Sequence, residues 1–368
     1  MRLAHGIVVC GLTLIATACG GSKDSGAVAD TSVAAATPAP STMVASPGMP
    51  DQQMQAVLDQ LAALGGKPIV TLTPSEARKQ PAPSDAVAAL LIKAGKDTSA
   101  TSLVPGVTSV DRTIPGAGGP LPVRIYTPSG AGPFPVVVYY HGGGWVIANK
   151  NVYDAGARTI AKNANAVVVS VDYRLAPEHK FPAQHDDALT TYRWALQNAA
   201  SIKGDPTRMA IAGESAGGNL AVATAVAVRD AKLTMPKAIV SVYPIAQTDT
   251  TTASYIENAN AKPLNRTMMV WFFKQTVRTP ADLQDTRLDL VKANFTGLPP
   301  VTIINAQIDP LRDDGAMLEQ ALKSAGVSVE RRVYPGVTHE FFGMGAVVNK
   351  AKQAEQYAGD RLKAGLGS

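Results

Sequence analysis

The residues with the clearest capacity for chemistry form the segment Gly-Glu-Ser-Ala-Gly at 213–217, with Ser215 at its centre. The apolar stretch Met209 to Ala212 comes just before it, and an Ala/Val-rich helical stretch follows it to about Arg229. Between a strand and a helix, flanking glycines permit a tight turn that holds a serine hydroxyl above a sheet. The segment therefore predicts a nucleophilic Ser215. An ordinary strand-to-helix turn is the alternative, because such pentapeptides also arise by chance.

A second glycine-rich segment, His-Gly-Gly-Gly-Trp at 141–145, directly follows the apolar stretch 136–140. Glycines allow the backbone to approach a substrate closely, and backbone N–H groups can stabilise the negative oxygen of a tetrahedral intermediate. We predict that the N–H groups of Gly142, Gly143 and Ala216 form this oxyanion hole. A merely flexible glycine loop is the alternative.

A serine hydroxyl is a weak nucleophile until a base removes its proton, so a histidine must lie within reach. The chain has five histidines, of which His5 lies in the amino-terminal leader described below. We expect His141 to brace the glycine loop, and His179 and His185 to be surface or packing residues. His339 lies in a loop after the last predicted strand, which agrees with the chain order serine, acid, histidine. We therefore predict that His339 is the base, with a structural histidine as the alternative.

The carboxylate that orients the base should come from the region between the serine and the histidine. Asp309 follows the apolar stretch 301–305, at the carboxyl end of a predicted strand, where sites gather in open α/β sheets. Asp313 and Asp314 compete for the role. Both begin the next predicted helix, where the helix dipole favours carboxylates, so capping explains them without catalysis. We predict Asp309 as the acid.

These residues need a sheet that presents them at one edge. Apolar stretches alternate with helical segments from residue 107 onward. Those at 136–140 and 167–171 are apolar apart from Ser170 and do not alternate with polar residues, as in parallel strands covered on both faces. The predicted fold class is therefore α/β, with a mostly parallel central sheet flanked by helices. The predicted strands are Val107–Ile114, Val123–Thr127, Val136–Tyr140, Val167–Val171, Met209–Ala212, Ala238–Tyr243, Val301–Asn305 and Val329–Tyr334.

The alternation lapses in two places. Residues 51–105 contain apolar residues at helical spacing before the first strand, and residues 245–299 contain a compact apolar group, 268–273, between polar stretches. We predict that both regions form a helical cap over the carboxyl edge of the sheet. The catalytic domain then comprises residues 106–244 and 300–368.

Six motifs follow one another along the chain: His141–Trp145, Tyr173–Glu178, Phe181–Ala183, Gly213–Gly218, Asp309–Asp313 and His339–Phe342. Together they resemble the bacterial hormone-sensitive-lipase-like esterases, which have the α/β-hydrolase fold. The resemblance spans about residues 107–363 and implies hydrolysis of short- to medium-chain acyl esters beneath a helical cap, with no metal and no cofactor. Two features depart from the family: Glu214 stands where members often carry Asp, and the amino terminus differs.

The amino terminus lies outside the usual pattern of this family. Residues 1–18 have a basic start, an apolar stretch and the small residues Ala-Thr-Ala, as in an export signal. Cys19 follows directly, as in the lipobox of bacterial lipoproteins, so we predict lipidation at Cys19 and anchoring to a membrane of the cell envelope. Plain secretory cleavage after Ala18 is the alternative. Residues 19–50, rich in Ala, Ser, Thr, Pro and Gly, read as a flexible tether.

Composition limits the classes of function. A hydrophobic content of 46% supports a large core and excludes a disordered protein, and the net charge of +5 comes from scattered basic residues, which argues against nucleic acid as a partner. The sequence therefore predicts a serine carboxylic-ester hydrolase that acts on a small-molecule ester. Two alternatives stay open: the same machinery acting on an amide, lactone or carbonate, and a non-catalytic ligand-binding protein.

Overall fold

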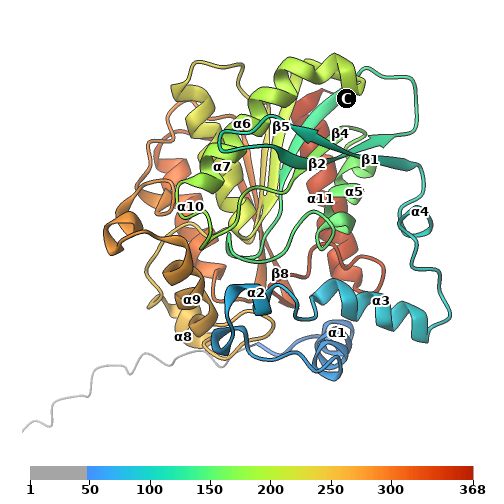
Figure 1. Cartoon of the computed structure of the whole chain (residues 1–368), viewed down its shortest axis with the longest axis vertical. Coiled ribbons are helices and arrows are strands. Elements are labelled where there is room, and N and C mark those ends of the chain that lie inside the picture. Colours follow the sequence, from blue (N-terminus) through green and yellow to red (C-terminus); the bar gives the residue numbers. More distant parts are fainter. Residues whose placement is uncertain (1–47, 368) are drawn as a thin grey trace, which may run out of the picture. The chain divides into compact units, whose positions relative to one another are not determined.

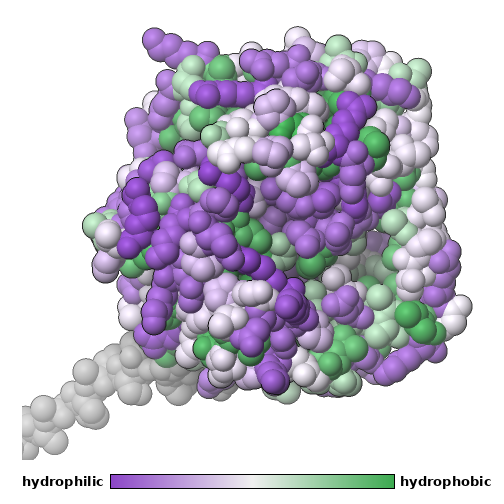
Figure 2. Space-filling model, viewed as in Figure 1, coloured by the Kyte–Doolittle hydropathy of each residue, from purple (hydrophilic) through white to green (hydrophobic). Residues whose placement is uncertain are grey.

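The computed structural model describes residues 48–367 (Figure 1). The predicted export signal, Cys19 and most of the predicted tether lie outside the described residues. The face in Figure 2 is largely hydrophilic, with apolar residues in small separate groups. Among the described residues, no helix combines the length and the apolar character that a membrane crossing would need.

The core of the fold is an eight-stranded sheet in the order β1-β2-β4-β3-β5-β6-β7-β8. Strand β2 pairs antiparallel with both β1 and β4, and every other pairing is parallel. All eight predicted strands are present, so the predicted α/β fold is confirmed. The strands are β1 Val107–Ile114, β2 Leu121–Pro128, β3 Phe134–Tyr140, β4 Val167–Val171, β5 Gly204–Glu214, β6 Ile239–Val242, β7 Val301–Ile308 and β8 Val329–Thr338.

The central strands are buried on both faces, which explains their unbroken apolar sequence. On β3, Val136 and Val138 belong to one hydrophobic cluster, and Val137 belongs to the other. Helices α6 (Ala183–Asn198), α7 (Ala216–Asp230) and α10 (Arg312–Ser324) contribute to the first cluster. Helices α5 (Asp154–Asn163) and α11 (Asn349–Leu366) contribute to the second.

The remaining helical elements come from the amino-terminal segment and from the insertion between β6 and β7. In Figure 1 helices of both regions lie near the end of the sheet where β8 finishes. Since η1 contacts α9, the two regions also touch each other. Their role as a cap over substrate stays a prediction. The elements are α1 Gln52–Ala63, η1 Ile69–Thr71, α2 Pro74–Ala77, α3 Pro83–Lys93, α4 Ala100–Leu103, α8 Ala253–Glu257, α9 Arg266–Thr276, η3 Pro280–Gln284 and η4 Leu290–Lys292; the short η2, Ala199–Ile202, extends α6.

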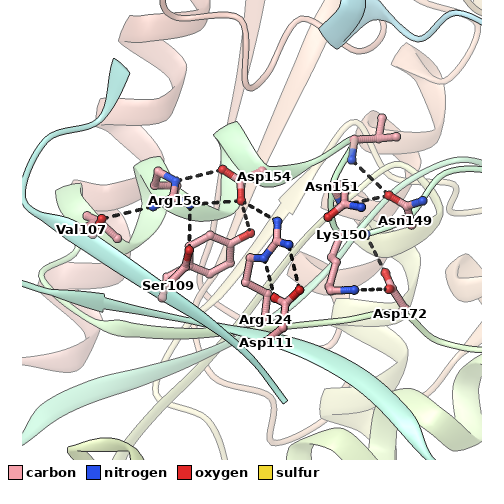
Figure 3. Close-up of polar contacts among 12 residues, drawn as sticks. Val107, Ser109, Asp111, Arg124, Asn149, Lys150, Asn151, Asp154, Arg158 and Asp172 are labelled. Atoms are coloured by element: carbon pink, nitrogen blue, oxygen red, sulfur yellow. Dashed lines mark hydrogen bonds and ion pairs between the residues drawn. The ribbon is translucent and has the colours of Figure 1, made fainter. Parts of the chain in front are cut away.

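A network of charged residues joins the antiparallel β1–β2 pair to the start of α5 (Figure 3). Asp154 accepts hydrogen bonds from Arg124 (3.0 Å), Tyr126 (2.9 Å) and Arg158 (2.9 Å). The buried Arg158 also donates to β1 and lies over the Tyr126 ring. Charge-assisted hydrogen bonds of this kind are stronger than neutral ones. The network therefore fixes the start of α5, immediately after Tyr153, whose side chain faces the candidate site.

Candidate active site

The turn between β5 and α7 holds Ser215 in a strained backbone conformation, with φ 57° and ψ −117°. Such a conformation persists only where the surroundings enforce it. Here the backbone is packed so closely that a Cβ atom at Gly213 would stand 2.1 Å from the Gly217 carbonyl oxygen. A Cβ at Gly217 would stand 2.0 Å from the Tyr140 carbonyl oxygen. The flanking glycines are therefore required by close approach of the backbone, as the sequence predicts.

Three residues far apart in the sequence converge at the carboxyl edge of the sheet. His339 Nε2 lies 2.9 Å from Ser215 Oγ, and His339 Nδ1 lies 2.8 Å from Asp309 Oδ2. With the Nδ1 proton donated to Asp309, Nε2 is free to accept the serine proton. All three side chains are buried. The structure thus brings Ser215, His339 and Asp309 together as predicted.

Asp309 is fixed by both of its carboxylate oxygens. Oδ2 accepts from His339, and Oδ1 accepts the N–H of Leu311 at 2.8 Å. Burial lowers the pKa of His339, but the charge of Asp309 and its hydrogen bond outweigh burial and leave that pKa above its ordinary value. Asp309 therefore makes the imidazole a better proton acceptor.

The competing aspartates bind the insertion instead. Asp313 accepts the N–H of Ser254 at 2.8 Å, and Asp314 accepts the N–H of Ala246 at 2.9 Å. Both lie in the first turn of α10, as predicted, but the N-cap of that helix, Leu311, makes no side-chain capping bond. The predicted favourable placement at the start of the helix therefore holds, but the side-chain hydrogen bonds of both aspartates go to the insertion and not to the helix end. The two carboxylates tie the insertion to the catalytic domain.

The glycine loop after β3 lies beside the serine turn. Among residues 48–367, the N–H groups of Gly142 and Gly143 have no hydrogen-bond acceptor, which leaves them free for an oxyanion. Ala216 is the first residue of α7, so its N–H lies at the helix N-terminus, where the helix dipole also favours negative charge. His141 stacks on Tyr173, with ring centroids 4.2 Å apart, and its Nδ1 donates to the Gly142 carbonyl at 2.7 Å.

The other two histidines lie away from the catalytic contacts. His185 is buried, where its Nε2 lies 3.1 Å from Asn219 Oδ1 and its ring packs edge-on against Phe181. His179 is exposed. These positions agree with the predicted packing and surface roles.

Helix α9 of the insertion packs onto the glycine loop. The ring of Phe272 lies against Gly144, and Phe273 lies near Trp145, with ring centroids 6.3 Å apart. Both phenylalanines and Trp271 are buried. The aromatic group of the insertion therefore supports the loop that carries the candidate oxyanion donors.

A layer of carboxylates and tyrosines behind the catalytic residues was missed at the sequence level. Glu214 accepts hydrogen bonds from Tyr139 and Tyr243, and burial raises its pKa to about 8. Glu340 accepts from Tyr153 at 2.7 and 2.8 Å. The sequence did contain one hint of this layer: Glu214 directly precedes Ser215, and Glu340 directly follows His339. Nothing in the sequence pairs the tyrosines with them.

No three side chains of His, Cys, Asp or Glu come close enough to hold a metal ion anywhere in the part of the chain that the structure describes.

Comparison with known proteins identifies the family. A model of the α/β-hydrolase fold matches residues 137–343, which include all three converging residues. A carboxylesterase of Mycobacterium tuberculosis, NlhH, is 40% identical over 261 residues, covering 68% of this chain and 81% of the relative. The chain belongs to this α/β-hydrolase family. The predicted resemblance to hormone-sensitive-lipase-like esterases is thereby confirmed.

Further relatives of this α/β hydrolase are esterases as well. An ethyl acetate hydrolase of Pseudomonas putida is 33% identical, covering 64% of this chain and 76% of the relative. The solved structure of a hyperthermophilic esterase from Pyrobaculum calidifontis superposes with a TM-score of 0.77 at 33% identity. It covers 86% of the present α/β hydrolase and 98% of the solved chain.

Proposed function

We propose that this α/β hydrolase is a serine carboxylic-ester hydrolase, with Ser215 as nucleophile, His339 as base and Asp309 as the acid that orients the base. One observation carries the proposal: the imidazole of His339 bridges the Ser215 hydroxyl at 2.9 Å and the Asp309 carboxylate at 2.8 Å. The carboxylesterase, esterase and ethyl acetate hydrolase names of its relatives support the same reaction.

Acylation begins when Ser215 Oγ attacks the ester carbonyl and His339 Nε2 takes the hydroxyl proton. The carbonyl oxygen becomes negative and is stabilised by the N–H groups of Gly142, Gly143 and Ala216. The imidazolium then gives its proton to the leaving alcohol as the C–O bond breaks. In the second half, His339 Nε2 removes a proton from water as the water oxygen attacks the acyl carbon. The bond between the acyl carbon and Ser215 Oγ then breaks, the imidazolium returns the proton to Oγ, and the acid is released.

The two alternative functions differ in what they require of the three converging residues. A non-catalytic binding protein has no need for a serine hydroxyl held on an imidazole, and such proteins typically lack a member of the triad. Hydrolysis of an amide, lactone or carbonate would use the same residues, because fold and triad do not fix the bond that is cut. Short- to medium-chain acyl esters are the proposed substrates, supported by the ethyl acetate hydrolase among the relatives.

Labelling and turnover test the proposal together. The wild-type protein should react with a fluorophosphonate probe and release p-nitrophenol from p-nitrophenyl acetate with a burst, whereas Ser215→Ala should do neither. Full turnover by Ser215→Ala would show that Ser215 is not the nucleophile. If the wild-type protein is labelled but hydrolyses no p-nitrophenyl ester from acetate to palmitate, it is not an esterase of this class. That result would favour hydrolysis of another acyl bond.

We also propose that the enzyme is exported and anchored through lipid on Cys19. The proposal rests on the basic start, the apolar stretch and the Ala-Thr-Ala-Cys run at 16–19. In a bacterial host, the full chain should incorporate labelled palmitate and partition with membranes, and Cys19→Ser should do neither. A wild-type chain that is exported without label would instead indicate plain secretory cleavage.

A further inference from the structure

Glu340 and Tyr153 form a pair that contacts two parts of the candidate active site. We infer that Glu340 is a positioning residue for ester hydrolysis. It places a second negative charge beside His339 Nε2. Through Tyr153, it also couples the loop after β8, which carries His339, to the glycine loop after β3, which carries the predicted oxyanion donors and is called the oxyanion loop below. This inference rests on the proposed function. Its basis is the geometry of five residues from loops that lie far apart in the sequence.

The first contact is with the catalytic imidazole. Glu340 Oε1 lies 3.9 Å from His339 Nε2, the atom that takes and returns the proton. Asp309 lies on the other nitrogen of the ring, at 2.8 Å. When His339 becomes an imidazolium, it therefore has a carboxylate on each side. An opposite charge within about 4–6 Å favours the charged form of a histidine.

The second contact runs from Glu340 to the oxyanion loop. Both carboxylate oxygens of Glu340 accept from the Tyr153 hydroxyl, at 2.7 and 2.8 Å. That hydroxyl lies directly beside Gly142, because a Cβ atom built there would stand 2.3 Å from it. The pair thus spans the space between the imidazole and the backbone that carries a predicted oxyanion donor.

The backbone of Glu340 supports a specific role for this side chain. Its φ of 69° lies in the left-handed region, where a residue other than glycine is uncommon. Such a conformation costs free energy and persists where other contacts enforce it. In this structure it directs the carboxylate to Tyr153 rather than to bulk solvent.

Water reaches the pair through a groove of about 810 Å³ between α3, α4, α5 and α11, whose lining includes Tyr153, Glu214 and Glu340. In Figure 2 the surface is hollowed at this place. The Glu340 side chain is 20% exposed, so it can exchange protons with solvent. Other titratable groups with an electrostatic effect on Glu340, or affected by it, are His339, Asp309, Glu214, Tyr139, Tyr173 and Tyr243.

Substitutions at the pair test the inference. Glu340→Gln keeps an oxygen for the Tyr153 hydroxyl and removes the charge, so the acid limb of the kcat/KM profile should move to lower pH by about one pH unit. The same variant should lower kcat about tenfold, with KM little changed. Tyr153→Phe keeps the charge and removes the bond, so kcat should fall while the acid limb moves less. Glu355→Gln, at another buried carboxyl of the groove, is the matched control and should leave both quantities unchanged.

The measurements are pH–rate profiles with p-nitrophenyl acetate and thermal unfolding of each variant. An unchanged acid limb and unchanged kcat in Glu340→Gln would overturn the inference. So would an equal shift in Glu355→Gln, because the effect would then belong to the groove as a whole. If Glu340→Gln does not fold, Tyr153→Phe decides: wild-type kcat in that variant overturns the coupling. Failure of the proposed function would differ, because wild-type protein would then hydrolyse no ester.

Discussion

The ring of Phe272 on α9 lies so close to Gly144 that a Cβ atom at residue 144 would stand 2.3 Å from it. The insertion and the oxyanion loop therefore share one packed interface. Gly144 also has a φ of 58°, which L residues rarely adopt.

Gly144→Ala should consequently disturb the oxyanion loop and lower kcat for p-nitrophenyl acetate by about tenfold or more, since misplaced donors stabilise the transition state poorly. The double variant Gly144→Ala with Phe272→Ala should regain part of the loss, because it relieves the clash but not the backbone strain. Equal activities of the single and double variants would show that the contact with α9 has no influence on the loop.

The assignment of the acid can be tested against its neighbour on α10. Asp309→Asn should lower kcat by about 10³- to 10⁴-fold. The amide NH₂ of the new side chain can donate to His339 Nδ1, which favours the imidazole tautomer with its proton on Nε2, where it cannot accept the serine proton. Burial raises the pKa of Asp314 to about 8, and its oxygens accept N–H bonds from Ala246 and Gln247 rather than from the imidazole. Asp314→Asn leaves the contact between Asp309 and His339 in place and should keep kcat within a few fold. The reverse ranking of the two variants would show that the acid is misassigned.

Buried carboxyl groups should make stability depend on pH. Burial raises the pKa of Glu214 to about 8 and that of Glu355 to about 7, above the ordinary value of 4.5. The unfolded chain therefore loses these protons first as pH rises, so their contribution to stability is complete below about pH 4.5 and is lost as pH rises to about 8. The melting temperature should fall over this range. In Glu214→Gln the fall should be smaller, and an identical pH dependence in that variant would contradict the assignment.

Arg78, the C-cap residue of α2, ties the amino-terminal segment to the loops beside the site. Its guanidinium donates to the carbonyl oxygens of Val146 at 2.8 Å and Ala176 at 2.7 Å, and also to Glu178. Arg78→Ala should lower the free energy of unfolding by about 1–3 kcal/mol, because two carbonyls lose a charged donor. Glu178→Gln should cost less than about 1 kcal/mol, since the Glu178 side chain is 53% exposed. Urea unfolding compares the two, and equal losses would indicate that the ion pair carries the effect.

The strands could be predicted because burial on both faces leaves a strong signal in the sequence. Val136–Tyr140 and Val167–Val171 are buried at every position and apolar at all but Ser170, and both lie in the middle of the sheet. The start of β5 was missed, because residues 204–208 are largely polar and only Gly204 among them pairs with β3, before a register shift that ends at Met209. The antiparallel direction of β2 also depends on neighbouring strands and not on its own composition.

The convergence of Ser215, Asp309 and His339 could be predicted because the order and the places after strands that such a site requires follow from the chemistry. The second layer could not. Tyr153 and Glu340 are 187 residues apart, and their contact depends on how α5 starts and how the loop after β8 turns. The hydrogen-bond partners of Asp313 and Asp314 could not be predicted for the same reason, since those partners lie in the insertion.

The close backbone packing at Gly213 and Gly217 has a practical consequence for engineering. The reactive geometry is set by main-chain atoms that no side chain can replace, so a saturation library should lose nearly all variants at these two positions. Helix α9, by contrast, contacts the glycine loop through side chains such as Phe272. Substitutions on α9 can therefore adjust the support of that loop while the main-chain turn that holds Ser215 stays intact.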